Sequence, residues 1–434
     1  MISFLERQFK ISERGSSVKT EILSGVVTFV TMSYIIFVNP GIMSKTGMDF
    51  NALVVATCTS AALATFLMAF LANYPIGLAP GMGLNAFFAF SVVLGMQIDW
   101  RVALTAVLVE GVIFIVLTLT KLREMVVNTI PKSLKIGISG GIGLFIAFIG
   151  LQGAGIVVKN DATLVSLGHL SGNLQALLAL GGLILMAVLE AYKVTGALLI
   201  GILAVTAASV GLNLVALPES FVSHPPSIAP IFAQLDFSML NRLDFWVIMF
   251  TFFFVDFFDT VGTLVGVCNR SGLLDKDGCL PNARGALLAD AIGTTAGAIL
   301  GTSTVTSYVE SASGIAQGGR TGLSALVTAA LFLAAMFFTP VVGMVPAYAT
   351  APALIIVGVY MMVSLRDLNF DDWTELVPSI LGFIMMPLAY SVSIGIEFAI
   401  VSYVLIKILS GRMKDVSWLM AALAVIFVVK EALS

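Results

Sequence analysis

Long apolar runs, separated by short polar segments, cover most of this chain. A helix of about 20 mainly apolar residues can cross a bilayer, because it satisfies its own backbone hydrogen bonds there. We therefore predict an all-α polytopic membrane protein with 14 transmembrane segments. They are expected near residues 21–43, 53–71, 75–95, 101–119, 134–152, 174–191, 195–213, 245–267, 283–300, 305–317, 322–345, 349–364, 375–391 and 393–410.

The low charge content supports a membrane protein and excludes several other classes. Only 11% of the 434 residues are charged, against about 25% in soluble proteins. This excludes an ordinary soluble enzyme, a disordered chain and a nucleic-acid-binding protein with a basic face. The three cysteines are scattered and predict neither a disulfide framework nor a metal site.

The distribution of Lys and Arg predicts how the segments are oriented. With the N-terminus in the cytoplasm, 17 of these 22 cations fall in cytoplasmic segments and four fall outside, as the positive-inside rule requires. Residues 1–20 then form a cytoplasmic amphipathic lead-in. A tail helix is expected over 411–434, and its apolar run at 416–429 either spans the membrane or lies on its surface.

A polar, proline-containing stretch at 214–244 divides the segments into seven and seven. An odd number per half makes the two halves face opposite ways, as in transporters built from inverted repeats. We expect a first repeat over 21–213 and a second over 245–410, joined by 214–244 as an extracytoplasmic linker.

The third segment of each half is interrupted. Residues 75–85 contain prolines and glycines, and Gly-Thr-Ser-Thr at 301–304 precedes the short run at 305–317. Asn85 and Glu310 occupy corresponding places in the two segments. Paired broken helices of this kind predict a substrate site near the membrane midplane. Two loops flanked by hydrophobic helices remain an alternative.

Carboxylates enter the apolar runs, whereas no Lys or Arg lies well inside one. The six are Glu110, Asp256, Asp259, Asp290, Glu310 and Glu397. A buried carboxylate without a cation tends to take up a proton, so we predict proton coupling through Asp256, Asp259 or Glu310. Asp256 and Asp259 are three residues apart and share a helix flank, with Thr263 one turn further.

Other polar residues near these acids have two possible roles. The Asn85 carboxamide offers a ligand both a donor and an acceptor, and Phe87 lies beside it in the sequence. Asn85 could instead cap its own half-helix, and Asp256 could cap a neighbouring broken helix. For Asp290 and Thr304 we predict structural roles.

This set of residues suits a flat, neutral, hydrogen-bonding heterocycle, because carboxylates accept its N–H groups and aromatic rings cover its π face. A strongly anionic ligand would need Lys or Arg near the site, and the sequence places none there. An enzyme is disfavoured, since no His lies within a segment. Asp256 and Asp259 share one helix and lack a Gly-x-Gly-Asp motif, which disfavours an intramembrane aspartyl protease.

Five segments together carry a family resemblance. They are residues 77–87, 255–264, 289–291, 302–311 and 318–322. The chain resembles the nucleobase–cation symporters, specifically the AzgA-like purine permease branch. The resemblance implies a core domain (21–119 and 245–345) that moves against a gate domain (134–213 and 349–410). It also implies a short strand before a half-helix in segments three and ten, with substrate between them.

The resemblance also implies roles for single residues. Asp259, which precedes Thr-Val-Gly, and Glu310 would bind the substrate, and the AzgA-like branch adds Asn85. The remaining residues expected at the site are Ala86, Phe87, Thr263, Tyr308, Val309 and Ser311. The first segment lacks the Gln-His pair common in xanthine and uracil permeases, and Ser311 replaces a frequent amide. These departures leave adenine, guanine or hypoxanthine as substrates.

We therefore predict a secondary active transporter in the inner membrane that takes up a purine with a proton by alternating access. No cofactor or metal is expected, and H⁺ is favoured over Na⁺ as the coupling ion. A homodimer through the gate domains is expected within the lipid bilayer. An anion exchanger on the same fold and a passive channel remain the alternatives.

Overall fold

The computed structural model describes residues 2–120, 131–271, 273 and 280–433. Among the cations that we assigned to the cytoplasm, Lys121, Arg123 and Lys276 lie outside the described residues. Cys279 also lies outside them.

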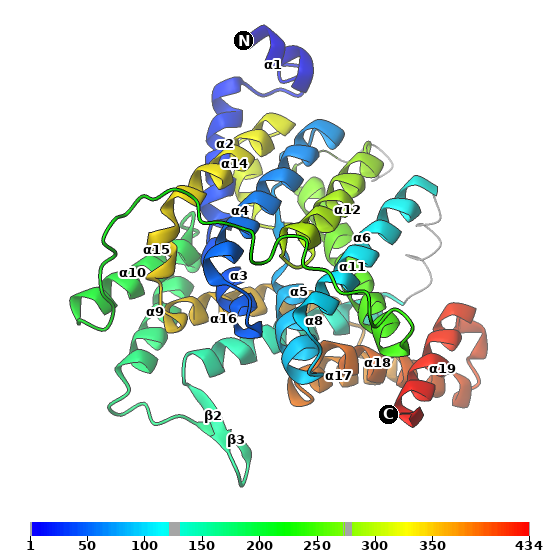
Figure 1. The fold of residues 1–434 in the computed structure, drawn as a ribbon. Coiled ribbons are helices and arrows are strands. Elements are labelled where there is room, and N and C mark those ends of the chain that lie inside the picture. The colour runs from blue at the N-terminus through cyan, green and yellow to red at the C-terminus, as the bar shows by residue number, and fades with distance from the viewer. Residues whose placement is uncertain (1, 121–130, 272, 274–279, 434) are drawn as a thin grey trace.

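Helices dominate both halves of the chain (Figure 1). The first half contains α1 (Ile2–Phe9), α2 (Val18–Met32), α3 (Ile35–Met43), η1 (Ser44–Thr46), α4 (Phe50–Leu67), η2 (Met68–Ala72), β1 (Leu78–Pro80), α5 (Met82–Ala86), η3 (Phe87–Gly95), α6 (Trp100–Thr120), α8 (Lys132–Gly153), β2 (Val157–Asn160), β3 (Leu164–Leu167), α9 (Leu174–Ala191) and α10 (Ala197–Gly211). The second half contains α11 (Leu243–Ser271), α12 (Ala283–Leu300), β4 (Val305–Ser307), α13 (Ser311–Ala316), α14 (Gly322–Ala335), η4 (Met336–Phe338), α15 (Thr339–Gly343), α16 (Ala347–Met362), η5 (Val363–Asp367), α17 (Trp373–Leu388), α18 (Val392–Leu409), η6 (Met413–Asp415) and α19 (Trp418–Leu433).

Within the described residues, nine helices are long and apolar enough to cross a membrane. Three shorter apolar helices cover Met82–Gly95, Ala197–Gly211 and Trp373–Leu388. This content agrees with the predicted polytopic helical membrane protein, whereas the count of 14 segments stays a prediction.

Strands β1 and β4 occupy the two interrupted segments and pair with each other. They run antiparallel, with Ala79 opposite Thr306. Backbone bonds from Gly81 N–H to the Thr304 carbonyl (2.9 Å) and from Tyr308 N–H to the Gly77 carbonyl (3.0 Å) extend the pairing. The short helices α5 and α13 follow the two strands, so the strand pair joins the two halves at their interrupted segments.

Two threonines brace this strand pair in the same way. Thr65 Oγ1 of α4 accepts from the Leu78 N–H (2.8 Å) and donates to the Leu78 carbonyl (3.0 Å). Thr294 Oγ1 of α12 does the same for Val305, at 3.2 and 3.0 Å. Both threonines are fully buried. Each half therefore satisfies the first residue of its strand through the helix that precedes it.

The remaining helices pack in two groups that each mix the two halves. In the first group α2 contacts α13 and α14, α4 contacts α12 and α14, and α6 contacts α11 and α12. In the second group α8 contacts α16 and α17, α9 contacts α10 and α16, and α17 contacts α18. Figure 1 shows the contact between α2 (blue) and α14 (yellow) in the first group. The boundaries of the proposed core and gate domains stay predictions.

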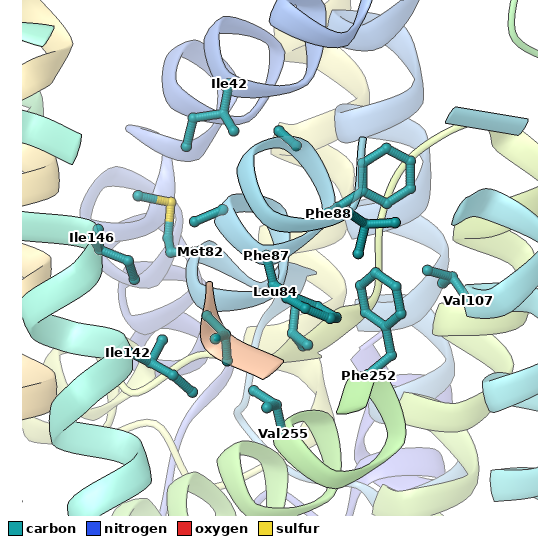
Figure 2. Close-up of a cluster of buried hydrophobic side chains, with 14 of the residues drawn as sticks. Ile42, Met82, Leu84, Phe87, Phe88, Val107, Ile142, Ile146, Phe252 and Val255 are labelled. Atoms are coloured by element: carbon teal, nitrogen blue, oxygen red, sulfur yellow. The ribbon is translucent and has the colours of Figure 1, made fainter. Parts of the chain in front are cut away.

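Buried hydrophobic side chains, aliphatic and aromatic, fill the interior next to the first interrupted segment (Figure 2). The Phe87 and Phe252 rings meet edge to face, with their centroids 4.8 Å apart. Phe88, Leu84 and Val107 belong to the same buried cluster. The π-helix η3 is thereby packed against α6 and α11.

The segment between α8 and α9 contains a hairpin that the all-α prediction lacked. Strands β2 and β3 pair antiparallel, with Val157 opposite Leu167. The Asn160 carboxamide accepts from the N–H groups of Ala162 and Thr163, at 2.9 and 3.0 Å, and closes the turn. The signal that the sequence contained is a set of β-branched residues on both sides of an Asn-Asp turn, with Val157 and Val158 before it and Thr163 and Val165 after it.

The C-terminal helix α19 is attached to α18 by a buried ion pair. Lys430 Nζ lies 2.5 Å from Glu397 Oε1, and the two side chains are 9% and 6% exposed. Ser393 Oγ also donates to Glu397, at 3.1 Å. Glu397 is therefore paired with Lys430 of the tail helix, a cation that lies outside the 14 predicted segments.

Candidate functional site

A cavity of about 550 Å³ lies beside the strand pair, in the size range of small-molecule sites. Its polar wall combines α11, β4 and the β4–α13 connection with Tyr34, which lies between α2 and α3, and with residues of α8, α16 and η5. The titratable and hydroxyl side chains that line it are Tyr34, Lys135, Ser139, Asp259, Thr263, Thr306, Ser307, Tyr308, Glu310, Tyr360 and Ser364. Apolar side chains such as Ile142 and Val357 complete the wall.

Glu310 enters the cavity at the end of the β4–α13 connection. Tyr34 donates its hydroxyl to Glu310 Oε1 at 2.6 Å. Tyr308 donates its hydroxyl to the Pro80 carbonyl at 2.5 Å, which ties the connection to β1. The Tyr34 and Tyr308 ring centroids are 6.5 Å apart. The carboxylate is therefore oriented by one tyrosine and held next to a second.

Asp259 reaches the same cavity from α11. Its side chain is half-buried, as is that of Glu310. Thr263, one turn further along α11, also lines the cavity, whereas Asp256 does not. Of the predicted residues, the structure thus gathers Asp259, Thr263, Tyr308, Val309 and Glu310 around one space.

The other predicted site residues lie outside the cavity lining. Asn85 is fully buried, and its carbonyl oxygen accepts from the Ser303 hydroxyl. Phe87 packs on Phe252 (Figure 2). Ser311 Oγ accepts from the Gly77 N–H at 3.0 Å. For these three residues, and for the neighbouring Ala86, a ligand role stays a prediction.

Asp290 and Thr304, which we expected to be structural, lie outside the cavity lining and connect neighbouring elements. Thr260 Oγ1 donates to Asp290 Oδ1 at 2.8 Å and links α11 to α12. Thr304 Oγ1 donates to Glu110 Oε2 at 3.1 Å and links the start of β4 to α6. Asp256, Asp290 and Glu110 are all fully buried.

Sequence reasoning missed two features of the cavity. Tyr34 was overlooked because a tyrosine within an apolar run looks like core packing. The expectation that no cation lies near the site was wrong, since Lys135 lines the cavity from the first turn of α8. Lys135 lies at the end of a predicted segment, and we therefore assigned it only as a cytoplasmic charge.

A sequence model described as a permease family matches residues 19–398. The adenine permease AdeP of Escherichia coli is 42% identical over 98% of this chain and 95% of its own length. The guanine/hypoxanthine permease PbuG of Bacillus subtilis is 43% identical over 97% of this chain and 98% of its own length. The chain belongs to the nucleobase–cation symporter family.

This membership confirms the family predicted from the five sequence segments. The chain is a multi-pass membrane transporter and not an enzyme. Its fold resembles that of the transmembrane domain of BicA, a cyanobacterial bicarbonate transporter. That likeness has a TM-score of 0.65 at 16% identity, and it covers 87% of this chain and 97% of the BicA domain.

Proposed function

We propose that this protein takes up a purine nucleobase together with a proton, using Asp259 and Glu310 to bind the base. The supporting observation is that these two carboxylates reach one cavity from different elements. Carboxylates accept hydrogen bonds from the N–H groups of a purine, and the Tyr308 and Tyr34 rings can cover its face. Relatives named as adenine and guanine/hypoxanthine permeases support this substrate class.

The proposal includes the finer architecture expected from the sequence. Fourteen segments would form two inverted repeats, with interrupted helices at β1 and β4 and a core that moves against a gate. The matching contacts of Thr65 and Thr294 support the repeat relation. The N-terminus would be cytoplasmic, the membrane would be the inner membrane, and gate domains would join two copies.

Proton coupling supplies the driving force in this proposal. Inward movement of one H⁺ yields about 2.3 kcal/mol per 100 mV, enough to concentrate a neutral base roughly fiftyfold. Asp256, Asp259 and Glu310 are the proposed proton carriers. No cofactor takes part.

Anion transport is the second candidate, and Lys135 is the observation that favours it. A cation in the cavity wall could attract an anion, and the fold is shared with a bicarbonate transporter. The same cavity contains Asp259 and Glu310, and ionised carboxylates would repel that ligand. We therefore prefer the purine.

Uptake of labelled adenine and hypoxanthine by cells that lack their own purine permeases tests the proposal. We expect Asp259→Asn and Glu310→Gln to lower uptake at least tenfold. Asp161→Asn is the matched control, because that carboxylate lies on the exposed hairpin. Competition by unlabelled bases at two pH values identifies the preferred purine. Wild-type uptake by both cavity variants would refute the assignment.

A further inference from the structure

Three carboxyl groups that do not line the cavity lie close to one another. Glu110 comes from α6, Asp256 from α11 and Asp290 from α12, and each side chain is 0% exposed. Thr304 and Thr260 donate to Glu110 and Asp290, at 3.1 and 2.8 Å. Neither hydroxyl donates to Asp256. The proposed binding of the base does not use Glu110.

Within this cluster, Glu110 and Asp256 interact directly through their side chains. Their carboxyl groups lie within hydrogen-bonding reach of each other. In the part of the chain that the structure describes, both Asp256 oxygens and Glu110 Oε1 lack a donor. Two ionised carboxylates have only acceptor atoms and repel each other in a buried site. One shared proton supplies the missing donor and removes the repulsion.

The charged groups around this pair are also acids. Asp290 of α12 and Asp259 of α11 are the further groups that interact with it electrostatically. Among the described residues, no Lys, Arg or His lies within ion-pair distance of Glu110 or Asp256. A proton is therefore the cation that this pair can hold without a further ligand.

The pair is connected to both sides of the cavity. Thr304, which donates to Glu110, directly precedes β4, and its carbonyl accepts from the Gly81 N–H next to β1. Asp256 lies one turn before Asp259 on α11. A change at the pair can thus reach the β4 connection that carries Glu310 and the helix that carries Asp259.

We propose that Glu110 and Asp256 share the transported proton, and that Thr304 couples the loading of this site to the β4–α13 connection that carries Glu310. The inference rests on the proposed function and adds a proton site separate from the carboxylates that bind the base. Loss of the proton leaves two adjacent buried charges, so release requires α6 and α11 to separate or water to enter.

The assignment can be tested with purified protein in liposomes, where purine binding and proton coupling are measured separately. Glu110→Gln keeps the shape of the side chain and donates to Asp256 as the protonated acid would. We expect its affinity for labelled hypoxanthine to stay within about twofold of wild type. Purine-driven proton entry and accumulation should fall at least tenfold. Glu310→Gln should instead lose binding. Proton entry at the wild-type rate by Glu110→Gln would overturn the proposal. Loss of hypoxanthine binding by Glu110→Gln would overturn it as well.

A second readout does not depend on the substrate. Infrared difference spectra across a pH titration report the carbonyl band of a protonated, buried carboxyl group. We expect Glu110→Gln and Asp256→Asn each to remove one such band, whereas Glu397→Gln, whose carboxylate is paired with Lys430, should retain it. An unchanged band in both variants would overturn the proton site. If these variants lose the band but the wild-type protein binds no purine, the proposed function is overturned and the proton site stands.

Discussion

The Tyr34 hydroxyl donates to Glu310 at 2.6 Å inside a largely apolar cavity. Such a bond orients the carboxylate before a ligand arrives, so that less conformational freedom is lost on binding. Tyr34 comes from the first half and Glu310 from the second. The contact therefore ties the geometry of the ligand site to the packing between halves.

Loss of this hydroxyl should weaken substrate binding. A hydrogen bond to a charged group contributes about 1.5–3 kcal/mol, so Tyr34→Phe should raise the KM for purine uptake roughly tenfold or more. Initial uptake rates over a range of purine concentrations measure the change. Tyr348→Phe is the control, because that buried hydroxyl has no hydrogen-bond partner among the described residues. Equal KM values for the two variants would contradict the role of Tyr34.

How well the sequence predicted single residues depended on their chemistry. Asp259 and Glu310 were found because ionisable groups are costly, and therefore conspicuous, in apolar segments. Tyr34 is amphipathic and fits a lipid-facing or core position equally well. Lys135 was assigned to the cytoplasm because only the folded chain shows that the first turn of α8 borders the cavity.

At the scale of elements, the strand pair depends on two threonines. Thr65→Val or Thr294→Val would leave a strand N–H and a carbonyl buried without partners, at a cost of about 1–3 kcal/mol for each group. We expect each variant to lower the Tm of the purified protein in detergent. Thr65→Ser and Thr294→Ser keep the hydroxyl and should recover most of the stability. If valine and serine variants melt alike, the threonine contacts do not stabilise the strands.

The tail helix gives a second prediction at this scale. Removing one partner of a buried ion pair costs about 3–5 kcal/mol, because the remaining charge is left uncompensated. Lys430→Met should therefore lower the Tm, and the double variant Lys430→Met/Glu397→Leu should recover much of the loss. A double variant as unstable as the single one would show that the pair does not account for the docking of α19.

Helices were predictable where the apolar run was long and uninterrupted. The positions of α4, α6, α8, α9 and α18 follow closely from the apolar runs. The hairpin at 157–167 was missed because β2 and β3 are only four residues each. The pairing of β1 with β4 joins residues more than 200 positions apart, a contact that local patterns do not encode.

At the scale of the whole molecule, the distribution of charge sets the orientation. The proposed topology places the β2–β3 hairpin outside the cell and the α18–α19 connection in the cytoplasm. On a cysteine-free background, Asp161→Cys should react with an impermeant maleimide in intact cells. Lys414→Cys should react only after the cells are opened. The reverse labelling pattern would invert the topology and the direction of transport inferred from it.

The measurement that tests the central claim most directly is proton entry into liposomes that contain the purified protein. External adenine or hypoxanthine should acidify the lumen of wild-type vesicles, because each base enters with H⁺. Asp259→Asn and Glu310→Gln vesicles should show no such signal. Bicarbonate or sulfate flux without any purine response would contradict the account and favour the anion exchanger.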